Sequence, residues 1–189
     1  MTATNPASRL VTLEELAGFP ERPRYELVAG VLVELPTAET AVHEETVALV
    51  GMRLSNHVEP NRLGVILGSN YGYVTVKEAP STCRNADVSF IAAERGQQKD
   101  LYGMFYDGAP DLAVEILSGF DCDLELPQKT AEYLAAGGEA VWIIDTDTRT
   151  LTVHTADTPP LVLTDADTVD GGDYMLGFTC AVADLLPTP

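Results

Sequence analysis

The spacing of apolar residues along the chain predicts an alternation of helices and strands. From residue 39 to about residue 58, apolar residues recur at intervals of three and four, as on the buried face of a helix. Residues 111–118 (DLAVEILS) and 140–146 (AVWIIDT) are short apolar runs, which are typical of buried strands. Residues 85–92 (NADVSFIA) alternate in the manner of a strand with one apolar side.

Local signals mark where the first elements begin and end. Thr12, followed three residues later by Glu15, has the pattern of a helix N-cap and predicts a short helix over TLEELAGF. Residues 24–36 (RYELVAGVLVELP) read as two strands joined by a turn near Ala29-Gly30. The chain is therefore expected to open with a helix and a β-hairpin.

Glycine and proline punctuate the middle of the chain. Pro60 and Gly64 are expected to end the long helix, and residues 64–76 then read as a strand pair interrupted by glycines. Residues 94–108 are polar and contain glycine, which indicates a loop.

The order of elements is helix, hairpin, helix, several strands, helix, strand and further strands. A mixed central β-sheet flanked by helices is the layered arrangement that suits this order. The predicted fold class is therefore α/β (α+β), with an N-terminal β-hairpin and extra C-terminal strands. Residues 1–23 are expected to form a helical lead-in, and residues 24–189 a single domain.

Length and composition restrict the number of domains and the cellular environment that the sequence predicts. The 189 residues, 46% of them hydrophobic, suffice for one domain with a core but not for two. No window approaches the roughly 18 apolar residues of a membrane span, and the N-terminus does not have the pattern of a signal peptide. Cys83, Cys122 and Cys180 show no CxxC spacing, which favours a reducing, cytoplasmic environment and gives no support for a zinc site.

The charge balance is strongly acidic. The chain has 29 Asp and Glu residues against 11 Lys and Arg residues, a net charge of -18. Such a surface repels polyanions, so a role on nucleic acid requires a special arrangement of the few basic residues. The acidic surface is otherwise explained as a solubility shell. Among the basic residues, Lys77, Lys99 and Lys129 are the lysines, and their positions are therefore informative.

Three acidic residues fall inside or at the start of apolar strands: Glu26, Asp87 and Glu115. A carboxylate in a strand that is covered on both faces is disfavoured unless its charge is compensated. Each acid alone could be a tolerated residue at a strand end. Acids on neighbouring strands could instead meet at one edge of a sheet, where a hard dication such as Mg²⁺ is the usual partner. Asp111, after Pro110, is less suited as a ligand and is better explained by a role in a turn or by contacts that support the ligands.

Lys129 could bring an ammonium group to the metal-bound water or to the scissile phosphate. It lies in residues 125–138, which are predicted to start a helix near Pro127 and to end it at Gly137-Gly138. The preceding connection can fold this helix back along the end of the strand that carries Glu115. The alternative for Lys129 is an ordinary solvated position on the helix.

The sequence resembles a known family over most of its length. The segments RYELVAGVLVELP, VHEETVALVGMRL, ADVSFIA, APDLAVEILS and QKTAEYLAAGGEAVWIIDT, in this order, are similar to the Uma-type family of putative restriction endonucleases. That family belongs to the PD-(D/E)XK nuclease superfamily. The resemblance implies a restriction-endonuclease-like core and hydrolysis of phosphodiester bonds with Mg²⁺ or Mn²⁺.

The resemblance also implies roles for individual residues. Asp87 stands at the acid of the family's PD element and Glu115 at the acid of its (D/E)XK element. Both would bind the metal together with the main-chain carbonyl of Ile116. Leu117 occupies the usual lysine position, and Lys129 on the next helix fits the migrated lysine of this family.

Further matches and departures accompany these positions. Glu26 matches an additional family acid, as an outer ligand or part of a second metal site, and His43 fits a position at which the family often has histidine, without a role that we can assign. Asn85-Ala86 replaces the common Arg-Pro before Asp87, and ILSGFD replaces the common LSPSD loop. Neither departure removes a predicted ligand.

The predicted function is that of a Mg²⁺-dependent endonuclease acting on nucleic acid, DNA in the first instance, and working as a homodimer. The main alternative is a catalytically silent binding or assembly module that keeps the nuclease fold. A second alternative is a metal-dependent hydrolase of small phosphorylated molecules. A serine hydrolase is disfavoured because no GxSxG element occurs, and GSNYGY does not have the features of a P-loop.

Overall fold

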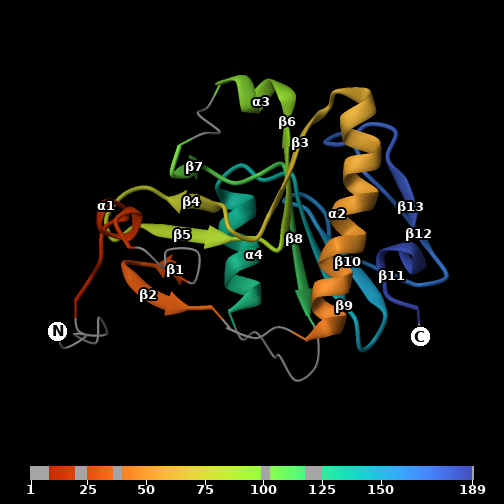
Figure 1. Cartoon of the computed structure of the whole chain (residues 1–189), viewed down its shortest axis with the longest axis horizontal. Coiled ribbons are helices and arrows are strands. Elements are labelled where there is room, and N and C mark those ends of the chain that lie inside the picture. Colours follow the sequence, from red (N-terminus) through yellow and green to blue (C-terminus); the bar gives the residue numbers. More distant parts are fainter. Residues whose placement is uncertain (1–8, 20–24, 36–39, 99–102, 118–124, 189) are drawn as a thin grey trace.

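The structure is a computed structural model, and it describes residues 9–19, 25–35, 40–98, 103–117 and 125–188. The helices are α1 (Leu13–Ala17), α2 (Ala41–Asn61), α3 (Ala93–Gln98), α4 (Leu126–Ala135) and the short 3-10 helix η3 (Val182–Leu185). The strands are β1 (Tyr25–Val28), β2 (Val31–Glu34), β3 (Gly64–Gly68), β4 (Gly72–Val76), β5 (Thr82–Asn85), β6 (Val88–Ala92), β7 (Phe105–Asp107), β8 (Leu112–Leu117), β9 (Ala140–Asp145), β10 (Thr150–His154), β11 (Leu161–Thr164), β12 (Thr168–Asp170) and β13 (Thr179–Ala181). Figure 1 shows their arrangement.

The described strands form two main sheets. The five-stranded sheet has the order β2-β1-β5-β4-β7, and the six-stranded sheet has the order β11-β10-β9-β8-β6-β3. In the six-stranded sheet, β8 is parallel to β9 and antiparallel to β6, so this sheet is mixed. The predicted α/β (α+β) class is confirmed, but the strands are divided between two sheets where one central sheet was expected.

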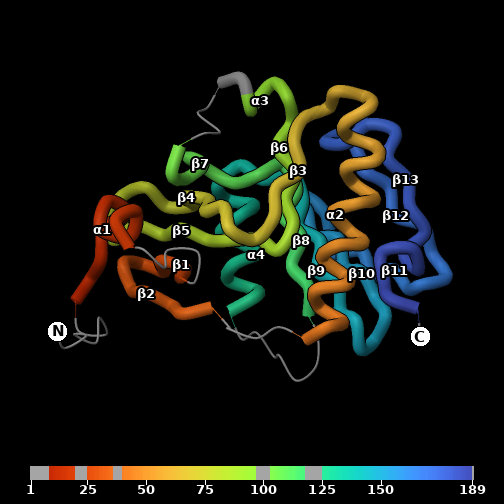
Figure 2. The backbone as a smooth tube through the Cα atoms, viewed as in Figure 1, coloured from red at the N-terminus to blue at the C-terminus, as the bar shows by residue number. Residues whose placement is uncertain are grey.

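Helix α2 and the C-terminal elements cover one face of the six-stranded sheet. Val50, Leu54 and Val58 of α2 are fully buried and join one core cluster with Trp142 of β9. The same cluster includes residues of β13 and η3, which lie beside α2 on the side away from the five-stranded sheet (Figure 2). This is the principal hydrophobic core, and it fixes the orientation of β6 and β8.

Helix α4 lies on the other face of the six-stranded sheet. Its Tyr133 packs with Ala113 of β8 and Val141 of β9, and also with Tyr73 of the five-stranded sheet. α4 is therefore held between the two sheets. Any polar side chain on its inner face is enclosed by strands from both.

The N-terminal elements form as predicted. Thr12 and Glu15 make the reciprocal hydrogen bonds of a capping box at the start of α1. β1 and β2 pair as an antiparallel hairpin through a turn at Ala29 and Gly30, both at positive φ. Helix α1 and this hairpin pack on each other, with Leu16 and Leu27 in one buried cluster.

Three local expectations are wrong. β3 and β4 both form, but they do not pair with each other, because β3 pairs with β6 and β4 pairs with β5. The described part of segment 94–108 contains α3 and β7, and β7 is a strand because it pairs in parallel with the distant β4. Helix α2 includes Pro60 and ends at Asn61, where Arg62 adopts a left-handed conformation.

None of the helices in the described ranges combines the length and apolar character needed to traverse a bilayer.

Candidate active site

The site lies where the chain passes from one main sheet to the other. β5 belongs to the five-stranded sheet and β6 to the six-stranded sheet, and Asp87 sits between them. The Asp87 N–H donates to the carbonyl of Val114 (3.0 Å), and Asp87 Oδ2 accepts the N–H of Ile116 (2.7 Å). These two bonds extend the pairing of β6 with β8 and place the Asp87 carboxylate against the end of β8.

Glu115 occupies the middle of β8, in which side chains alternate between faces. Val114 and Ile116 join the core beneath α2, while Glu115 is directed to the opposite face, toward α4. Lys129 of α4 meets it there, with Nζ 2.8 Å from Glu115 Oε2. Both side chains are buried, at 8% and 7% exposure. The buried carboxylate of β8 is therefore paired with a lysine from the next helix.

Glu26 of β1 completes the contact around Lys129. Glu26 Oε1 lies 3.0 Å from Lys129 Nζ and accepts the N–H of Asn85 (2.9 Å). The structure thus brings Glu26, Glu115 and Lys129 together from two sheets and a helix. Asp87 lies near enough to affect the ionisation of Glu115.

Arg84 of β5 also belongs to this cluster, and the sequence did not single it out. Its side chain is 1% exposed, and its Nη1 donates to Glu26 Oε2 (2.8 Å). Its Nε donates to Glu132 Oε2 of α4 (2.6 Å), and Nη1 also contacts Glu125 Oε2 (3.3 Å). The available signal was an arginine within a short strand, three residues before Asp87, since a buried guanidinium requires acidic partners.

Two further residues considered from the sequence have clear positions. His43 is buried in the first turn of α2, and its Nε2 lies 3.4 Å from Asp87 Oδ2. Asp111 lies at the other end of β8, where its carboxylate accepts the N–H of Ala92 and pairs with Arg95. Asp111 therefore holds the start of β8 and lies outside the site.

Burial and neighbouring charge set the ionisation of the cluster. Burial raises the pKa of Glu115 to about 8, an effect that Lys129 opposes and the charges of Asp87 and Glu26 reinforce. Burial also acts to raise the pKa of Glu26, but Lys129 and Arg84 together bring it below its ordinary value. The pKa of Lys129 is raised in spite of burial, because Glu115 and Glu26 stabilise its charge.

The donor set suits a hard divalent cation. Asp87 and Glu115 supply carboxylates, and Oε1 of Glu115 is buried with no hydrogen-bond partner among the described residues. Within those residues, no group of three or more His, Cys, Asp or Glu side chains is placed to hold a metal. Mg²⁺ is commonly bound by one or two carboxylates with water completing its shell, so two carboxylates and a main-chain carbonyl are compatible with it.

The comparisons with a family model and with solved structures both return matches. The model of the Uma2 family, described as "Putative restriction endonuclease", matches residues 10–183. The crystal structure of a putative nuclease belonging to DUF820, from Anabaena variabilis ATCC 29413, superposes with a TM-score of 0.78 at 20% sequence identity, covering 93% of this chain and 97% of that chain. The comparison with curated protein sequences returns no match. At 20% identity, the structural likeness shows a shared fold.

Proposed function

The chain belongs to the Uma2 family, and on this premise we propose that it is a nuclease that uses Mg²⁺ or Mn²⁺ to hydrolyse phosphodiester bonds in nucleic acid. The observation that carries the proposal is the meeting of Glu115 and Lys129, 2.8 Å apart, beside Asp87. An acid just before β6 and an acid in the adjacent β8, with an ammonium group at their side, form an arrangement suited to metal-assisted phosphate chemistry.

In the proposed mechanism, Asp87, Glu115 and the main-chain carbonyl of Ile116 would hold the cation. Its chemistry there would be to polarise a phosphate oxygen and to lower the pKa of a water. The hydrogen bond from the Ile116 N–H occupies Oδ2 of Asp87 and orients its carboxylate. The pKa of Glu115, about 8 without metal, means that the cation competes with a proton for this carboxylate near neutral pH.

Lys129 supplies a fixed positive charge at the site. Its ammonium group contacts Glu115 and Glu26, and its raised pKa keeps it protonated at neutral pH. A positioned ammonium stabilises the negative charge that develops on a phosphate during attack and orients the attacking water. Glu26 fixes the lysine between the two carboxylates and enlarges the acidic cluster around the metal.

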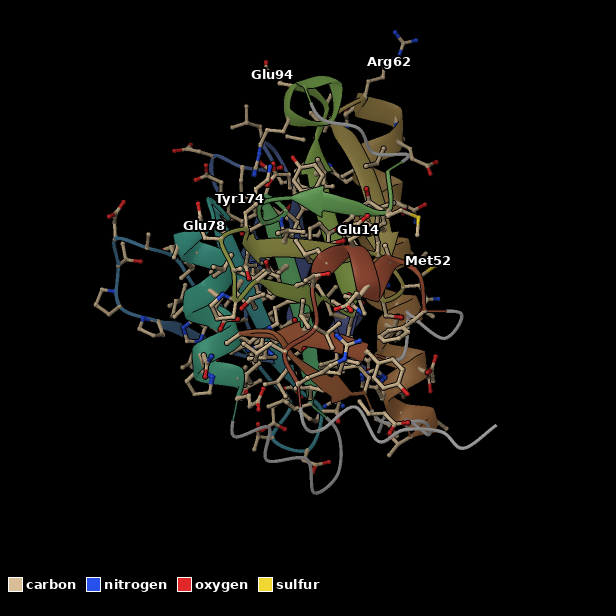
Figure 3. The ribbon with its side chains drawn as sticks, turned by 90° about the vertical axis from the view of Figure 1, so that its left-hand side faces the viewer. Glu14, Met52, Arg62, Glu78, Glu94 and Tyr174 are labelled. Atoms are coloured by element: carbon tan, nitrogen blue, oxygen red, sulfur yellow. The ribbon has the colours of Figure 1, made fainter. Side chains whose placement is uncertain are left out.

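The basic residues restrict how a polyanionic substrate approaches. In the described part of the chain, Arg9, Arg53, Arg95 and Arg149 each pair with an acid away from the cluster. Arg62 follows the C-terminal end of α2 and points outward at the top of Figure 3, whereas His43, which contacts Asp87, lies in the first turn of the same helix. These arginines do not converge on the site, so we propose that DNA binding depends on a homodimer, or that the substrate contacts the protein over a short length.

Cleavage assays test the proposal directly. Supercoiled plasmid and single- and double-stranded oligonucleotides are incubated with Mg²⁺, Mn²⁺ or chelator, using wild type and the variants Asp87→Asn, Glu115→Gln and Lys129→Met. We expect metal-dependent cleavage by wild type and a loss of about a hundredfold or more in each variant. Asp165→Asn, which removes a surface partner of Arg149, is the control purified in the same way and should cleave normally.

Activity that survives all three substitutions would place the chemistry elsewhere. A wild type that cleaves none of these substrates would contradict the proposal.

A catalytically silent module with the nuclease fold is the second candidate. It is favoured by the net charge of -18 and by the pairing of Lys129 with two acids. Isothermal titration with Mn²⁺ separates the two candidates. A nuclease should bind one ion at a site that Glu115→Gln abolishes, whereas a silent module should show no such site.

A further inference from the structure

Arg84 links the elements that surround Lys129. Its side chain, 1% exposed, extends from β5 and contacts Glu26 of β1 through Nη1 and Glu132 of α4 through Nε. The distances are 2.8 Å and 2.6 Å, which are short charge-assisted hydrogen bonds. A guanidinium this deeply buried is retained where its planar donor set matches several acids at once.

The acids of α4 hold the Arg84 guanidinium in place. Glu125 and Glu132 lie four residues before and three residues after Lys129, so the three side chains share one face of the helix. Arg84 contacts both acids, at 3.3 Å and 2.6 Å, and Gln128 donates to the other oxygen of Glu132 at 2.7 Å. The guanidinium is thereby fixed at the same helix face that carries the lysine.

Glu26 is shared between the two cations. Its Oε2 accepts from Arg84, while its Oε1 lies 3.0 Å from Lys129 Nζ and accepts the N–H of Asn85. Because Arg84 already compensates the charge of Glu26, the Lys129 ammonium is not drawn to Glu26 alone. It can then remain 2.8 Å from Glu115.

We infer that Arg84 is a positioning residue: by satisfying Glu26, it keeps the Lys129 ammonium beside Glu115. The catalytic consequence of this placement rests on the proposed nuclease function. The placement itself can be measured without any activity. Loss of Arg84 leaves Glu26 undercompensated, and the ammonium then moves toward Glu26 and away from Glu115.

Steady-state kinetics give the first test. Arg84→Gln should lower kcat by about a hundredfold with little change in KM, because the lysine is misplaced while the substrate-binding surface is unchanged. Arg95→Gln is the matched control, since Arg95 is also partly buried and paired with an acid, Asp111, but at the other end of β8. It should lower thermal stability without altering kcat. Equal kcat values for Arg84→Gln and wild type would overturn the inference.

A double variant, Arg84→Gln with Glu26→Gln, tests whether Arg84 acts through Glu26. Its comparison with Glu26→Gln alone also reveals a loss of kcat that is caused only by misfolding of Arg84→Gln. Glu26→Gln removes the charge that Arg84 compensates, while the amide oxygen can still accept from Lys129. Arg84→Gln should therefore add little to the effect of Glu26→Gln, so that the double variant keeps a kcat within a few-fold of the Glu26→Gln single variant. A further large fall in the double variant would show that Arg84 acts by another route.

NMR of the metal-free protein separates this inference from the nuclease proposal. The chain has three lysines, so ¹³Cε-labelled lysine gives few signals, and Lys129→Met assigns the one of interest. Arg84→Gln should shift the Lys129 signal, Arg95→Gln should not, and the double variant should match Glu26→Gln. If wild type cleaves no nucleic acid, the nuclease proposal fails and these spectra still decide the role of Arg84. An unchanged Lys129 signal in Arg84→Gln would overturn the inference that Arg84 positions Lys129. A Lys129 signal in the double variant that differs from the signal in Glu26→Gln would also overturn it.

Discussion

At the scale of single residues, the buried carboxylate of Glu115 has the largest consequences. Its side chain is 8% exposed and, among the residues that the structure describes, has one charged partner, Lys129, for two carboxylate oxygens. Desolvation disfavours the charged form, which is why its pKa rises to about 8. The site therefore contains a group that is protonated in the folded, metal-free protein at a pH where ordinary glutamates are ionised.

This shift predicts a pH dependence of stability. The folded protein holds a proton on Glu115 between pH 4.5, the ordinary value, and about 8, whereas the unfolded chain does not. The contribution of Glu115 to stability is therefore present below that range and is lost as the pH rises through it. Urea unfolding in chelator should show wild type losing more stability from pH 6 to pH 8.5 than Glu115→Gln, because titrations common to both proteins cancel. Parallel profiles would contradict the assignment.

The residues of the site were predictable to different degrees. Glu115 and Asp87 stood out because acids are costly inside apolar strands, and Lys129 because lysine is rare in this chain. Arg84 was not recognised, because its significance depends on Glu26 and Glu132, which are 58 and 48 residues away. A contact between such distant positions leaves no pattern in the local sequence.

At the scale of elements, the segments with strong local signals were predicted well and those that depend on partners were not. Helix α1 follows the expected capping residue, Thr12, and helix α4 has the expected proline, Pro127, in its first turn, while β6 and β8 follow their apolar patterns. β7 is only three residues long and lies in a polar, glycine-containing stretch, and it was not recognised because it forms by pairing with the distant β4. The separation of β3 from β4 likewise depends on their different partners, β6 and β5.

The two glycines of β3 give a matched prediction at this scale. A Cβ on Gly64 would lie 2.0 Å from the carbonyl oxygen of Ile91, while a Cβ on Gly68 would meet nothing within 4 Å. Gly64→Ala should cost about 1–3 kcal/mol, because backbone must move to relieve the overlap. Gly68→Ala should change stability by no more than about 1 kcal/mol, in either direction.

Urea unfolding of the two glycine variants measures this difference. Equal stability of both variants would mean that β3 does not approach β6 as described.

At the scale of the whole molecule, the acidic charge acts on the entire fold. The net charge of -18 produces self-repulsion in the compact state, which salt screens. Salt also weakens surface ion pairs such as Lys77–Asp107, but exposed pairs of this kind contribute about 1 kcal/mol or less each. The repulsion should therefore dominate the response to salt.

The prediction is that the urea midpoint of unfolding rises when NaCl is increased from low concentration to about 0.5 M. At that concentration the Debye length is roughly 3–5 Å, so the repulsion between surface charges is screened. Chloride and sodium are suitable because they act mainly by screening at these concentrations. A midpoint that falls with added salt would show that specific ion pairs outweigh the net charge.

The arrangement of the whole fold explains why the site is formed where it is. Two sheets enclose α4, and the chain crosses between them next to Asp87. The acids of the two sheets can meet the helix lysine only because this helix lies between them. The family relationship and the geometry therefore support the same hypothesis, a divalent cation held beside Lys129.

Crystals soaked in Mn²⁺ test this hypothesis most directly. An anomalous difference map should show one peak within coordinating distance of the carboxylates of Asp87 and Glu115 and of the main-chain carbonyl of Ile116, and this peak should be absent in crystals of Glu115→Gln. A map with no peak between these groups in wild-type crystals, or a peak that persists unchanged in Glu115→Gln, would contradict the account.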